Sequence, residues 1–449
     1  MKESDIHLKV HFIGIGGIGV SALARYYLAK GWKVTGSDLA KSEITEALEK
    51  SGAQIYPGEK ALDGLSPDFV VYSPAVKSTN AELKEARRLG IKSMSYPEAL
   101  GELTKKYKTI AVAGAHGKST TTAMIGLMMV AAKLDPTVIV GTKVKEFGDS
   151  NFRLGKSEYL VIEACEYDRS FLNYWPQIIV LTNIEMDHME CYGSESELVH
   201  VFEQFADHLP KSGALIACAD DANVGKIALR SENKKIETKK YSVLQPEADR
   251  LRQIMKIPGE HNIANGLAAL AVGRRLNIPD EQIYSSLAEY KGTWRRFDQE
   301  NGIVAGKKII VVSDYGHHPT QIKLTMAAAR QKWPDKKIIC VFQPHQAYRT
   351  HILFDGFVDV FKKSPVDKIF VTDIYKVAGR ESDEIVKKVS SQKLVGAVNL
   401  KEVEYVPQGQ ISERLDLETK GGEIVLVMGA GNIYNLSKEL VGGLKQSCD

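Results

Sequence analysis

Short apolar runs with the length of buried strands alternate with helix-like stretches along the whole chain. The runs lie at residues 8–13, 33–36, 69–72, 109–113, 159–162, 178–182, 308–312, 338–342, 368–371 and 424–428. Helix-like stretches between them include residues 21–30, 120–133, 264–276 and 321–332. Strands that alternate with helices form mostly parallel sheets with helices on both faces. The chain is therefore expected to be an α/β protein.

The same pattern restarts twice, which sets the expected domain boundaries. The chain has 449 residues, more than one hydrophobic core usually serves. A second strand with a glycine turn begins near residue 109, and a third strand-rich block follows the Arg-rich stretch at residues 294–297. We expect three domains: a Rossmann-like domain at residues 1–104, a central P-loop-type domain with a mostly parallel sheet at 105–297, and a second Rossmann-like domain at 298–449.

Composition excludes several classes of protein. The net charge of +3 is too small for a nucleic-acid-binding surface, and no apolar run approaches the ~18 residues that span a bilayer. The five cysteines are scattered without a Cys-x-x-Cys pair, as is usual for reduced thiols. Because the first residues are polar and do not resemble a signal peptide, we expect a cytoplasmic protein that binds neither nucleic acid nor membrane.

The first glycine turn, Gly14-Ile-Gly-Gly-Ile-Gly19, lies between a strand and a helix. Its glycines permit a tight turn whose N–H groups approach a diphosphate at the helix start. Asp38 follows Gly19 by 19 residues, at the end of the next strand, where a carboxylate can bind a ribose hydroxyl. By itself this motif indicates a nicotinamide cofactor and hence an oxidoreductase, with a ligand-free tight turn as the plain alternative.

The second glycine turn, Gly114-Ala-His-Gly-Lys-Ser-Thr120, also joins a strand to a helix. It is a short form of the P-loop, because Val112 stands where the full pattern has its first glycine. The loop can wrap a triphosphate, Lys118 can bind its β and γ phosphates, and the Ser119 hydroxyl can ligate Mg²⁺. Two phosphate-binding turns predict two different nucleotides, whereas a simple dehydrogenase needs only one.

Three further motifs, together with the two glycine turns, resemble the Mur ligases, which add amino acids to the UDP-sugar precursor of peptidoglycan. They are Asn183-Ile-Glu-Met-Asp-His-Met189, Gly259-Glu-His-Asn-Ile-Ala-Asn265 and Asp314-Tyr-Gly-His-His-Pro-Thr320. Phe342-Gln-Pro-His345 and Tyr348-Arg-Thr350 are similar to the branch that uses L-alanine. The resemblance implies three domains that bind UDP-sugar, ATP and the amino acid, and it reassigns the first glycine turn to the UDP diphosphate.

The resemblance also implies the reaction and its site. ATP would phosphorylate the carboxylate of UDP-N-acetylmuramate, and L-alanine would attack the acyl phosphate, with ADP and phosphate released by a monomer or weak homodimer. Residues expected to bind the UDP-sugar are Ile15, Gly16, Gly17, Ile18, Gly19, Asp38, Ser73 and Pro74. Residues expected to bind ATP are Gly114, Ala115, His116, Gly117, Lys118, Ser119, Thr120, Asn262, Arg296 and Asp314, and those expected to act in catalysis are Lys118, His188, Arg296 and Asp314. Residues expected to bind the amino acid are His317, His345, Tyr348, Arg349 and Arg380, and those expected to hold two Mg²⁺ ions are Ser119, Glu163 and His188.

Some alternatives stay open at this point. A recycling ligase would join a tripeptide to the same UDP-sugar, although residues 342–345 differ from the Glu-Pro-Arg-Ser expected of it. A nicotinamide-dependent oxidoreductase is the second alternative. Several family members carry a carbamylated lysine shortly after the Asp-His pair, but no lysine lies between His188 and Leu209. Arg296 and Arg380 could instead be solvated surface charges, and His188 a surface or capping residue.

Overall fold

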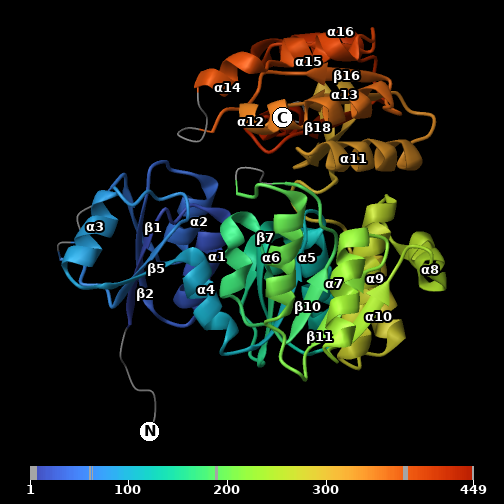
Figure 1. Ribbon diagram of the computed structural model, residues 1–449. Coiled ribbons are helices and arrows are strands. Elements are labelled where there is room, and N and C mark those ends of the chain that lie inside the picture. The colour runs from blue at the N-terminus through green and yellow to red at the C-terminus, as the bar shows by residue number, and fades with distance from the viewer. Residues whose placement is uncertain (1–7, 60–61, 63, 188–190, 378–382, 447–449) are drawn as a thin grey trace. The chain divides into compact units, whose positions relative to one another are not determined.

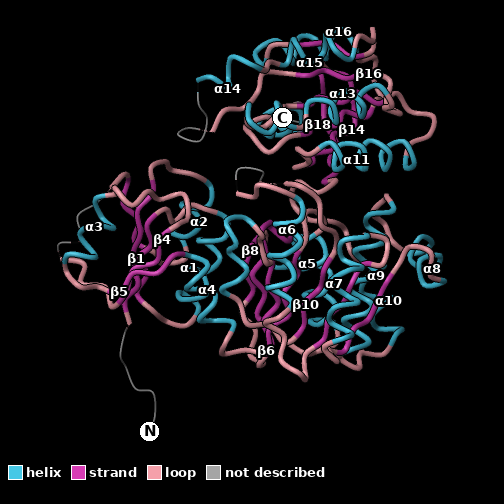
Figure 2. Tube along the Cα trace, viewed as in Figure 1, coloured by secondary structure: helices cyan, strands magenta, loops and turns pink. Residues whose placement is uncertain are grey.

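The computed structural model describes residues 8–59, 62, 64–187, 191–377 and 383–446. By its contacts the chain divides into two compact units: residues 1–186, 190–254 and 264–289 form the first, and residues 187–189, 255–263 and 290–449 form the second. The described residues form three sheets, two in the first unit and one in the second (Figures 1 and 2). The expected α/β class with three mostly parallel sheets is confirmed.

The first sheet is parallel and has the strand order β3-β2-β1-β4-β5, the order of the Rossmann fold around its switch point between β1 and β4. Both strands that flank this point end in a turn that the sequence singled out. The strands are β1 (Lys9–Ile13), β2 (Lys33–Asp38), β3 (Gln54–Pro57), β4 (Phe69–Tyr72) and β5 (Lys92–Ser95). The helices are α1 (Ile18–Ala29), α2 (Glu43–Lys50), α3 (Ala81–Arg88) and α4 (Tyr96–Thr104).

The second sheet has the order β12-β11-β10-β6-β9-β7-β8, and only the pairing of β8 with β7 is antiparallel. Its central strand β6 leads into the second glycine turn. The strands are β6 (Lys108–Ala113), β7 (Thr137–Val144), β8 (Ser150–Arg153), β9 (Tyr159–Glu163), β10 (Ile178–Leu181), β11 (Ala214–Cys218) and β12 (Glu237–Tyr241). The helices are α5 (Lys118–Ala131), η1 (Lys145–Phe147), η2 (Tyr167–Asn173), α6 (Glu195–Ala206), α7 (Ala222–Asn233), α8 (Pro246–Ile254), α9 (Glu260–Arg275) and α10 (Asp280–Glu289).

The third sheet has the order β13-β14-β18-β15-β16-β17, with β13 antiparallel to β14. The strands are β13 (Asp298–Val304), β14 (Lys307–Asp314), β15 (Ile338–Phe342), β16 (Lys368–Val371), β17 (Val403–Tyr405) and β18 (Ile424–Met428). The helices are α11 (Pro319–Lys332), α12 (Ala347–Ile352), α13 (Phe354–Lys362), α14 (Asp383–Lys388), α15 (Ser391–Val398), η3 (Gln408–Gln410), α16 (Ile411–Glu418) and α17 (Tyr434–Gln446).

The unbroken apolar runs of the third sheet follow from burial on both of its faces. In β18, Ile424, Leu426 and Met428 pack into one core, whereas Val425 and Val427 pack into the other. Helices α11, α13 and α15 contribute to the first core, and α16 and α17 to the second. Because successive strand side chains point to opposite faces, a doubly covered strand must be apolar at every position.

Candidate active site

The first glycine turn lies at the switch point of the first sheet. It leaves β1 with Gly14 at a φ of +76°, a conformation that favours glycine, and it leads into α1. Ser73, directly after β4, donates its N–H to the Ile13 carbonyl over 2.9 Å, so the two strand ends are joined. Pro74 follows in the same turn. The structure therefore brings together the residues after β1 and after β4 that were predicted to bind the UDP-sugar.

Asp38 at the end of β2 lies directly on this turn. Its Oδ2 accepts the N–H of Gly16 over 2.8 Å. A β-carbon at Gly16 would lie 2.8 Å from that same oxygen, so the close approach requires glycine. The N–H groups of Ile18 and Gly19 belong to the first turn of α1, where backbone donors have no acceptor within the helix. This end of α1 has the geometry of an anion site.

The second glycine turn wraps the start of α5, with Gly114 at a φ of +139° and Gly117 at +84°. Asn183, in the segment after the adjacent strand β10, holds the turn at three points. Its Oδ1 accepts the N–H of His116 over 2.8 Å, its Nδ2 donates to the His116 carbonyl over 3.0 Å, and its own carbonyl accepts the N–H of Ala115 over 3.0 Å. The loop conformation is therefore fixed before any ligand binds.

Lys118, the first residue of α5, is buried and lies against a carboxylate that was not predicted. Its Nζ lies 2.8 Å from Oε2 of Glu166, and it also donates to the carbonyls of Gly114 and Ala115. The side chains of Lys118 and Glu166 are 11% and 2% exposed. Burial alone would lower the pKa of Lys118, but the nearby carboxylates of Glu166 and Glu163 raise it well above its usual value. Lys118 therefore carries a fixed positive charge at the base of the glycine turn.

Two predicted metal ligands lie near the same turn. Glu163 is the last residue of β9, and its Oε2 accepts the N–H of Gly141 over 2.8 Å. Ser119 follows Lys118 in α5 and is 2% exposed. Hydroxyl and carboxylate oxygens are ligands that Mg²⁺ prefers. His188, the third predicted ligand, lies outside the described residues.

Three other side chains complete the surroundings of the second glycine turn. The Nε2 of His116 lies 2.9 Å from Oε2 of Glu185. Asn265 in α9 lies beside Gly117, and its Oδ1 accepts the hydroxyl of Thr121 over 3.1 Å. A β-carbon at Gly117 would collide with this Asn265 oxygen, so both the backbone conformation and the available space require glycine there.

Asn262, the residue expected near adenine, belongs to the second unit and is 5% exposed. Its Nδ2 donates to the carbonyl of Pro258 over 2.7 Å. This bond places the amide side chain at the start of α9.

Asp314 and Arg296 lie close to each other in the second unit. The Asp314 carboxylate accepts the N–H of Phe297 over 2.9 Å and that of Gly316 over 2.7 Å. Burial raises the pKa of Asp314, while the charge of Arg296 and these two N–H groups lower it in part. Asp314 therefore holds the backbone that directly follows Arg296.

Arg295, which was not predicted, is the buried member of the arginine pair. It is 7% exposed, and its guanidinium carbon lies 4.8 Å from the ring centre of Tyr315 and 4.9 Å from that of Tyr434. It also donates to the carbonyl of Gly429. Burial lowers the pKa of Arg295. These cation–π contacts anchor the segment that carries Arg296.

The residues expected to bind the amino acid cluster in the second unit around Arg349 of α12. Arg349 is 7% exposed by its side chain, and its Nη2 lies 3.0 Å from Oδ1 of Asp187, while its Nη1 lies 3.2 Å from Nδ1 of His345. His317 lies 3.8 Å from Asp187. Burial, followed by the charge of Arg349, lowers the pKa of His317 well below its usual value, although Asp187 opposes this shift. The imidazole is therefore neutral beside a guanidinium that already binds a carboxylate.

Two more residues are predicted to bind the amino acid. Tyr348 is half-buried and precedes Arg349 in α12. Arg380 lies outside the described residues.

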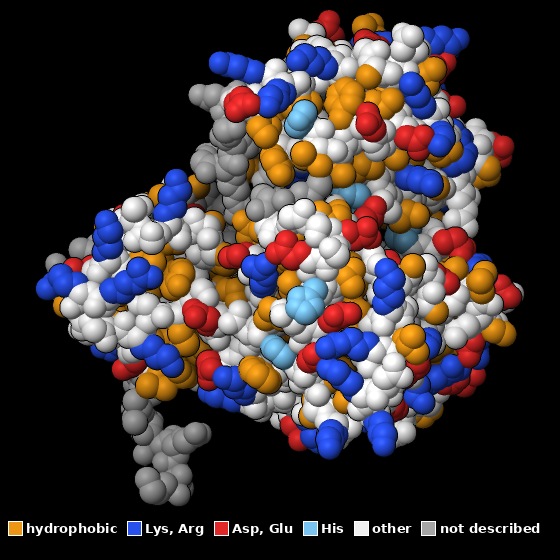
Figure 3. Space-filling model, viewed as in Figure 1, with side chains coloured by type: hydrophobic (Ala, Val, Ile, Leu, Met, Phe, Trp, Pro, Cys, Tyr) orange, Lys and Arg blue, Asp and Glu red, His pale blue; other side chains and the backbone are white. Residues whose placement is uncertain are grey.

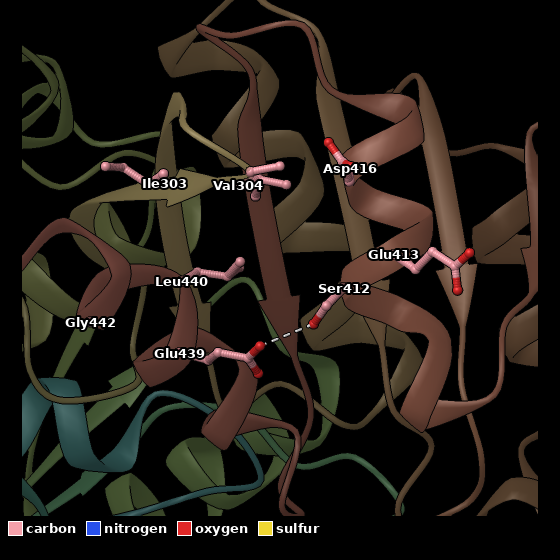
Figure 4. A pocket seen from close by; sticks show the side chains of 9 residues that line it. Ile303, Val304, Ser412, Glu413, Asp416, Glu439, Leu440 and Gly442 are labelled. Atoms are coloured by element: carbon pink, nitrogen blue, oxygen red, sulfur yellow. Dashed lines mark hydrogen bonds between the residues drawn. The ribbon is translucent and has the colours of Figure 1, made fainter. Parts of the chain in front are cut away.

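A hollow in the second unit lies apart from these residues. It has a volume of about 590 Å³ and is lined by residues of β13, α16 and α17, and by Ala305 after β13 (Figure 4). Two of its acidic side chains have partners: Glu439 accepts the Ser412 hydroxyl over 3.3 Å, and Asp416 pairs with Lys307 at 2.7 Å. None of the predicted site residues that the structure describes lines this hollow.

On the face shown in Figure 3, Lys and Arg side chains are intermixed with Asp and Glu. In the part of the chain that the structure describes, no helix is both long and apolar enough to cross a membrane.

The fold and site define an α/β protein with a glycine-rich strand-to-helix turn in each of its first two sheets, and three family models match successive parts of this chain. The Mur ligase family catalytic domain matches residues 9–108, the Mur ligase middle domain matches residues 112–273, and the Mur ligase glutamate ligase domain matches residues 295–431.

Relatives and solved structures agree with these matches. The UDP-N-acetylmuramate–L-alanine ligase of Clostridium tetani is 39% identical over 95% of this chain and 96% of its own length. The crystal structure of UDP-N-acetylmuramate-alanine ligase MurC from Thermotoga maritima is 25% identical with a TM-score of 0.80, and it covers 98% of this chain and 100% of its own. A murein peptide ligase from Psychrobacter arcticus shares the fold, with a TM-score of 0.72 at 22% identity over 97% of this chain and 98% of its own. The chain belongs to the Mur ligase family.

Proposed function

We propose that this protein is an ATP-dependent ligase that joins L-alanine to the carboxylate of UDP-N-acetylmuramate. The observation that carries the proposal is the 39% identity to an L-alanine ligase over nearly the full length of both chains. The reaction would form an acyl phosphate on the sugar carboxylate, which the amine of L-alanine attacks, giving ADP, phosphate and a peptide precursor of peptidoglycan.

The first sheet would bind the UDP-sugar. The N–H groups at the start of α1 suit a diphosphate, since they are unpaired within the helix and lie at its positive end. Asp38 and the Ser73–Pro74 turn flank this position and would contact the nucleoside. The proposed boundaries of the three binding domains are those expected from the sequence, residues 104 and 297.

The second glycine turn would bind the triphosphate of ATP. Lys118 would stabilise the charge on the transferred phosphoryl group, because its pKa is held high in a site with little water. The Lys118 ammonium donates hydrogen bonds to Glu166 and to two backbone carbonyls. On binding ATP it would replace some of these bonds by bonds to phosphate oxygens. Asn262, Arg296 and Asp314 would complete the nucleotide site.

Magnesium fits the donor set near this turn. Ser119 and Glu163 supply oxygen ligands, and Glu163 uses only one of its oxygens for the Gly141 N–H. The ion would neutralise phosphate charge when bound. A second ion at His188 is part of the same proposal.

Arg349 would bind the carboxylate of L-alanine. Its pairing with the Asp187 carboxylate over 3.0 Å supports this role, because the same guanidinium can bind the carboxylate of an amino acid. His317, which is neutral, and His345 lie beside it and would position the amino acid. Tyr348 and Arg380 are further candidates, and the protein would act in the cytoplasm as a monomer or weak homodimer.

Phosphate release with purified protein tests this function. We expect release with UDP-N-acetylmuramate, ATP, Mg²⁺ and L-alanine together, and none when any one is omitted. Release with L-alanyl-γ-D-glutamyl-diaminopimelate but not with L-alanine would instead establish the recycling ligase. Tight binding of a nicotinamide cofactor without ADP formation would establish an oxidoreductase.

A further inference from the structure

A group of polar side chains is buried inside the first sheet domain, on the face of the sheet that α3 covers. His11 of β1 is 0% exposed, Glu82 of α3 is 1% exposed and Ser37 of β2 is 2% exposed. The surrounding core is apolar and includes Val70 and Leu83. A buried carboxylate is costly unless it has good partners, so this group requires an explanation.

The contacts within the group are specific. Glu82 accepts the Ser37 hydroxyl over 2.5 Å with Oε2, and its Oε1 lies 3.4 Å from Nε2 of His11. The Nδ1 of His11 lies 2.8 Å from the hydroxyl of Thr35, its register partner on β2. Glu82 therefore connects β1 and β2 from a helix far along the chain.

The same segment of β2 holds the first glycine turn. The carbonyl of Ser37 accepts the N–H of Gly14 over 2.9 Å and that of Ile15 over 3.0 Å. The next residue, Asp38, accepts the N–H of Gly16. Ser37 and Asp38 thus fix three successive N–H groups of the turn, and Glu82 in turn holds the side chain of Ser37.

We propose that His11 and Glu82 are positioning residues for the UDP-sugar site. Glu82 holds Ser37, and His11 holds Glu82 and Thr35, so together they set the place of the Ser37 carbonyl and of Asp38, and hence the direction of the N–H groups in the turn. The inference rests on the proposed binding of UDP-N-acetylmuramate at this turn. Neither residue belongs to the turn: Glu82 acts through Ser37, and His11 acts through Glu82 and Thr35.

Stability alone explains this group poorly. A buried pair of ionisable groups adds little net stability compared with apolar side chains of similar volume, because desolvation offsets the attraction. Apolar residues at these two positions would simply extend the core around Leu83. A buried polar group instead fixes the orientation of the groups that it is hydrogen-bonded to, because hydrogen bonds are directional.

The test is the substitution Glu82→Gln in the full chain, with Glu85→Gln as the control. Glu85 lies on the same helix and pairs with Arg88 at the surface, so the control removes a carboxylate without touching β2. Loss of one charge-assisted hydrogen bond corresponds to a change of about tenfold. We expect Glu82→Gln to raise KM for UDP-N-acetylmuramate about tenfold while KM for ATP and L-alanine stay within about twofold, and Glu85→Gln to change none of them.

Calorimetric titration of each variant with UDP-N-acetylmuramate alone gives a second readout, and the same loss of affinity is expected. Should Glu82→Gln fail to fold, Ser37→Ala decides, because it removes only the hydroxyl that Glu82 accepts. An unchanged KM for the UDP-sugar, or an equal rise in KM for all three substrates, would overturn the positioning role. If the unaltered protein does not bind UDP-N-acetylmuramate at all, the proposed function fails instead.

Discussion

Replacing Lys118 with Met should destabilise the protein as well as inactivate it, because it leaves Glu166 buried without its cation. The two charges are 2.8 Å apart and nearly inaccessible. At an effective dielectric constant of about 20, their attraction is about 6 kcal/mol before desolvation is subtracted. Breaking such a pair from one side typically costs about 3–5 kcal/mol.

The double variant separates stability from activity. Lys118→Met alone should lower the free energy of unfolding by about 3 kcal/mol, whereas Lys118→Met with Glu166→Gln should lower it by only about 1 kcal/mol, since no buried charge is left unpaired. ADP formation should be lost in both, by at least about a thousandfold, because neither retains the cation at the phosphates. The control is Lys108→Met, whose pair with Glu158 has a similar distance but is 55% and 61% exposed, so no measurable change in the free energy of unfolding is expected.

Hydrogen exchange of peptides from β6 and α5 is the suitable assay. The protein has four tryptophans, and Trp175 and Trp294 fall in different units, so fluorescence mixes the unfolding of both. Exchange instead reports the local free energy of opening where the ion pair lies. A double variant as unstable as Lys118→Met, or a Lys118→Met variant no less stable than the exposed control, would show that the buried pair does not stabilise the fold in this way.

Three other predictions concern single residues. Gly117→Ala should lower the free energy of unfolding by about 1–2 kcal/mol, because residue 117 has a left-handed backbone, and it should abolish ATP turnover. The control is Gly225→Ala inside α7, where the added carbon meets no other atom. In thermal unfolding this variant should be as stable as the unaltered protein or more stable by up to about 1 kcal/mol. Burial raises the pKa of Asp314 above its value in the unfolded chain, so its contribution to stability is present at low pH and is lost as pH rises through the folded pKa. Asp314→Asn should remove this loss of stability with rising pH, as measured by unfolding curves at a series of pH values. Arg349→Lys should raise KM for L-alanine about tenfold or more and leave KM for ATP unchanged, because the Lys ammonium lacks the planar fork that gives two parallel N–H groups to a carboxylate. Arg414→Lys, at a partly exposed ion pair, should leave both constants unchanged in steady-state kinetics. An equal effect of the two substitutions would argue against the assigned role.

Much of the fold could be predicted from apolar runs. The strands at residues 69–72, 338–342, 368–371 and 424–428 have the expected bounds, and the others that were predicted differ by at most two residues at an end. The interior strands β7 and β11 were missed although both are largely buried. Edge strands were missed as well, as with β12, whose sequence Glu-Thr-Lys-Lys-Tyr is partly solvated and carries no apolar run. The chemistry of an edge strand resembles that of a loop, so its pairing becomes visible only in three dimensions.

The site was predictable only where a motif fixes its own geometry. Lys118 follows from its glycine turn, but its partner Glu166 depends on a turn in which Asp168 and Arg169 adopt positive φ, which no sequence period indicates. Arg295 and Arg296 are adjacent and chemically identical, so only the structure shows that Arg295 is the one buried among aromatic rings. Buried pairs formed across distant segments lie beyond what local patterns can specify.

The proposed reaction is tested most directly by the amount of ADP that the purified protein forms with ATP, Mg²⁺ and UDP-N-acetylmuramate, with each of a panel of amino acids in turn. We expect rapid formation of ADP and phosphate with L-alanine, in equal amounts with the alanyl product, and loss of both in Lys118→Met. Equal rates with every amino acid, or ADP formation that does not require the UDP-sugar, would contradict it.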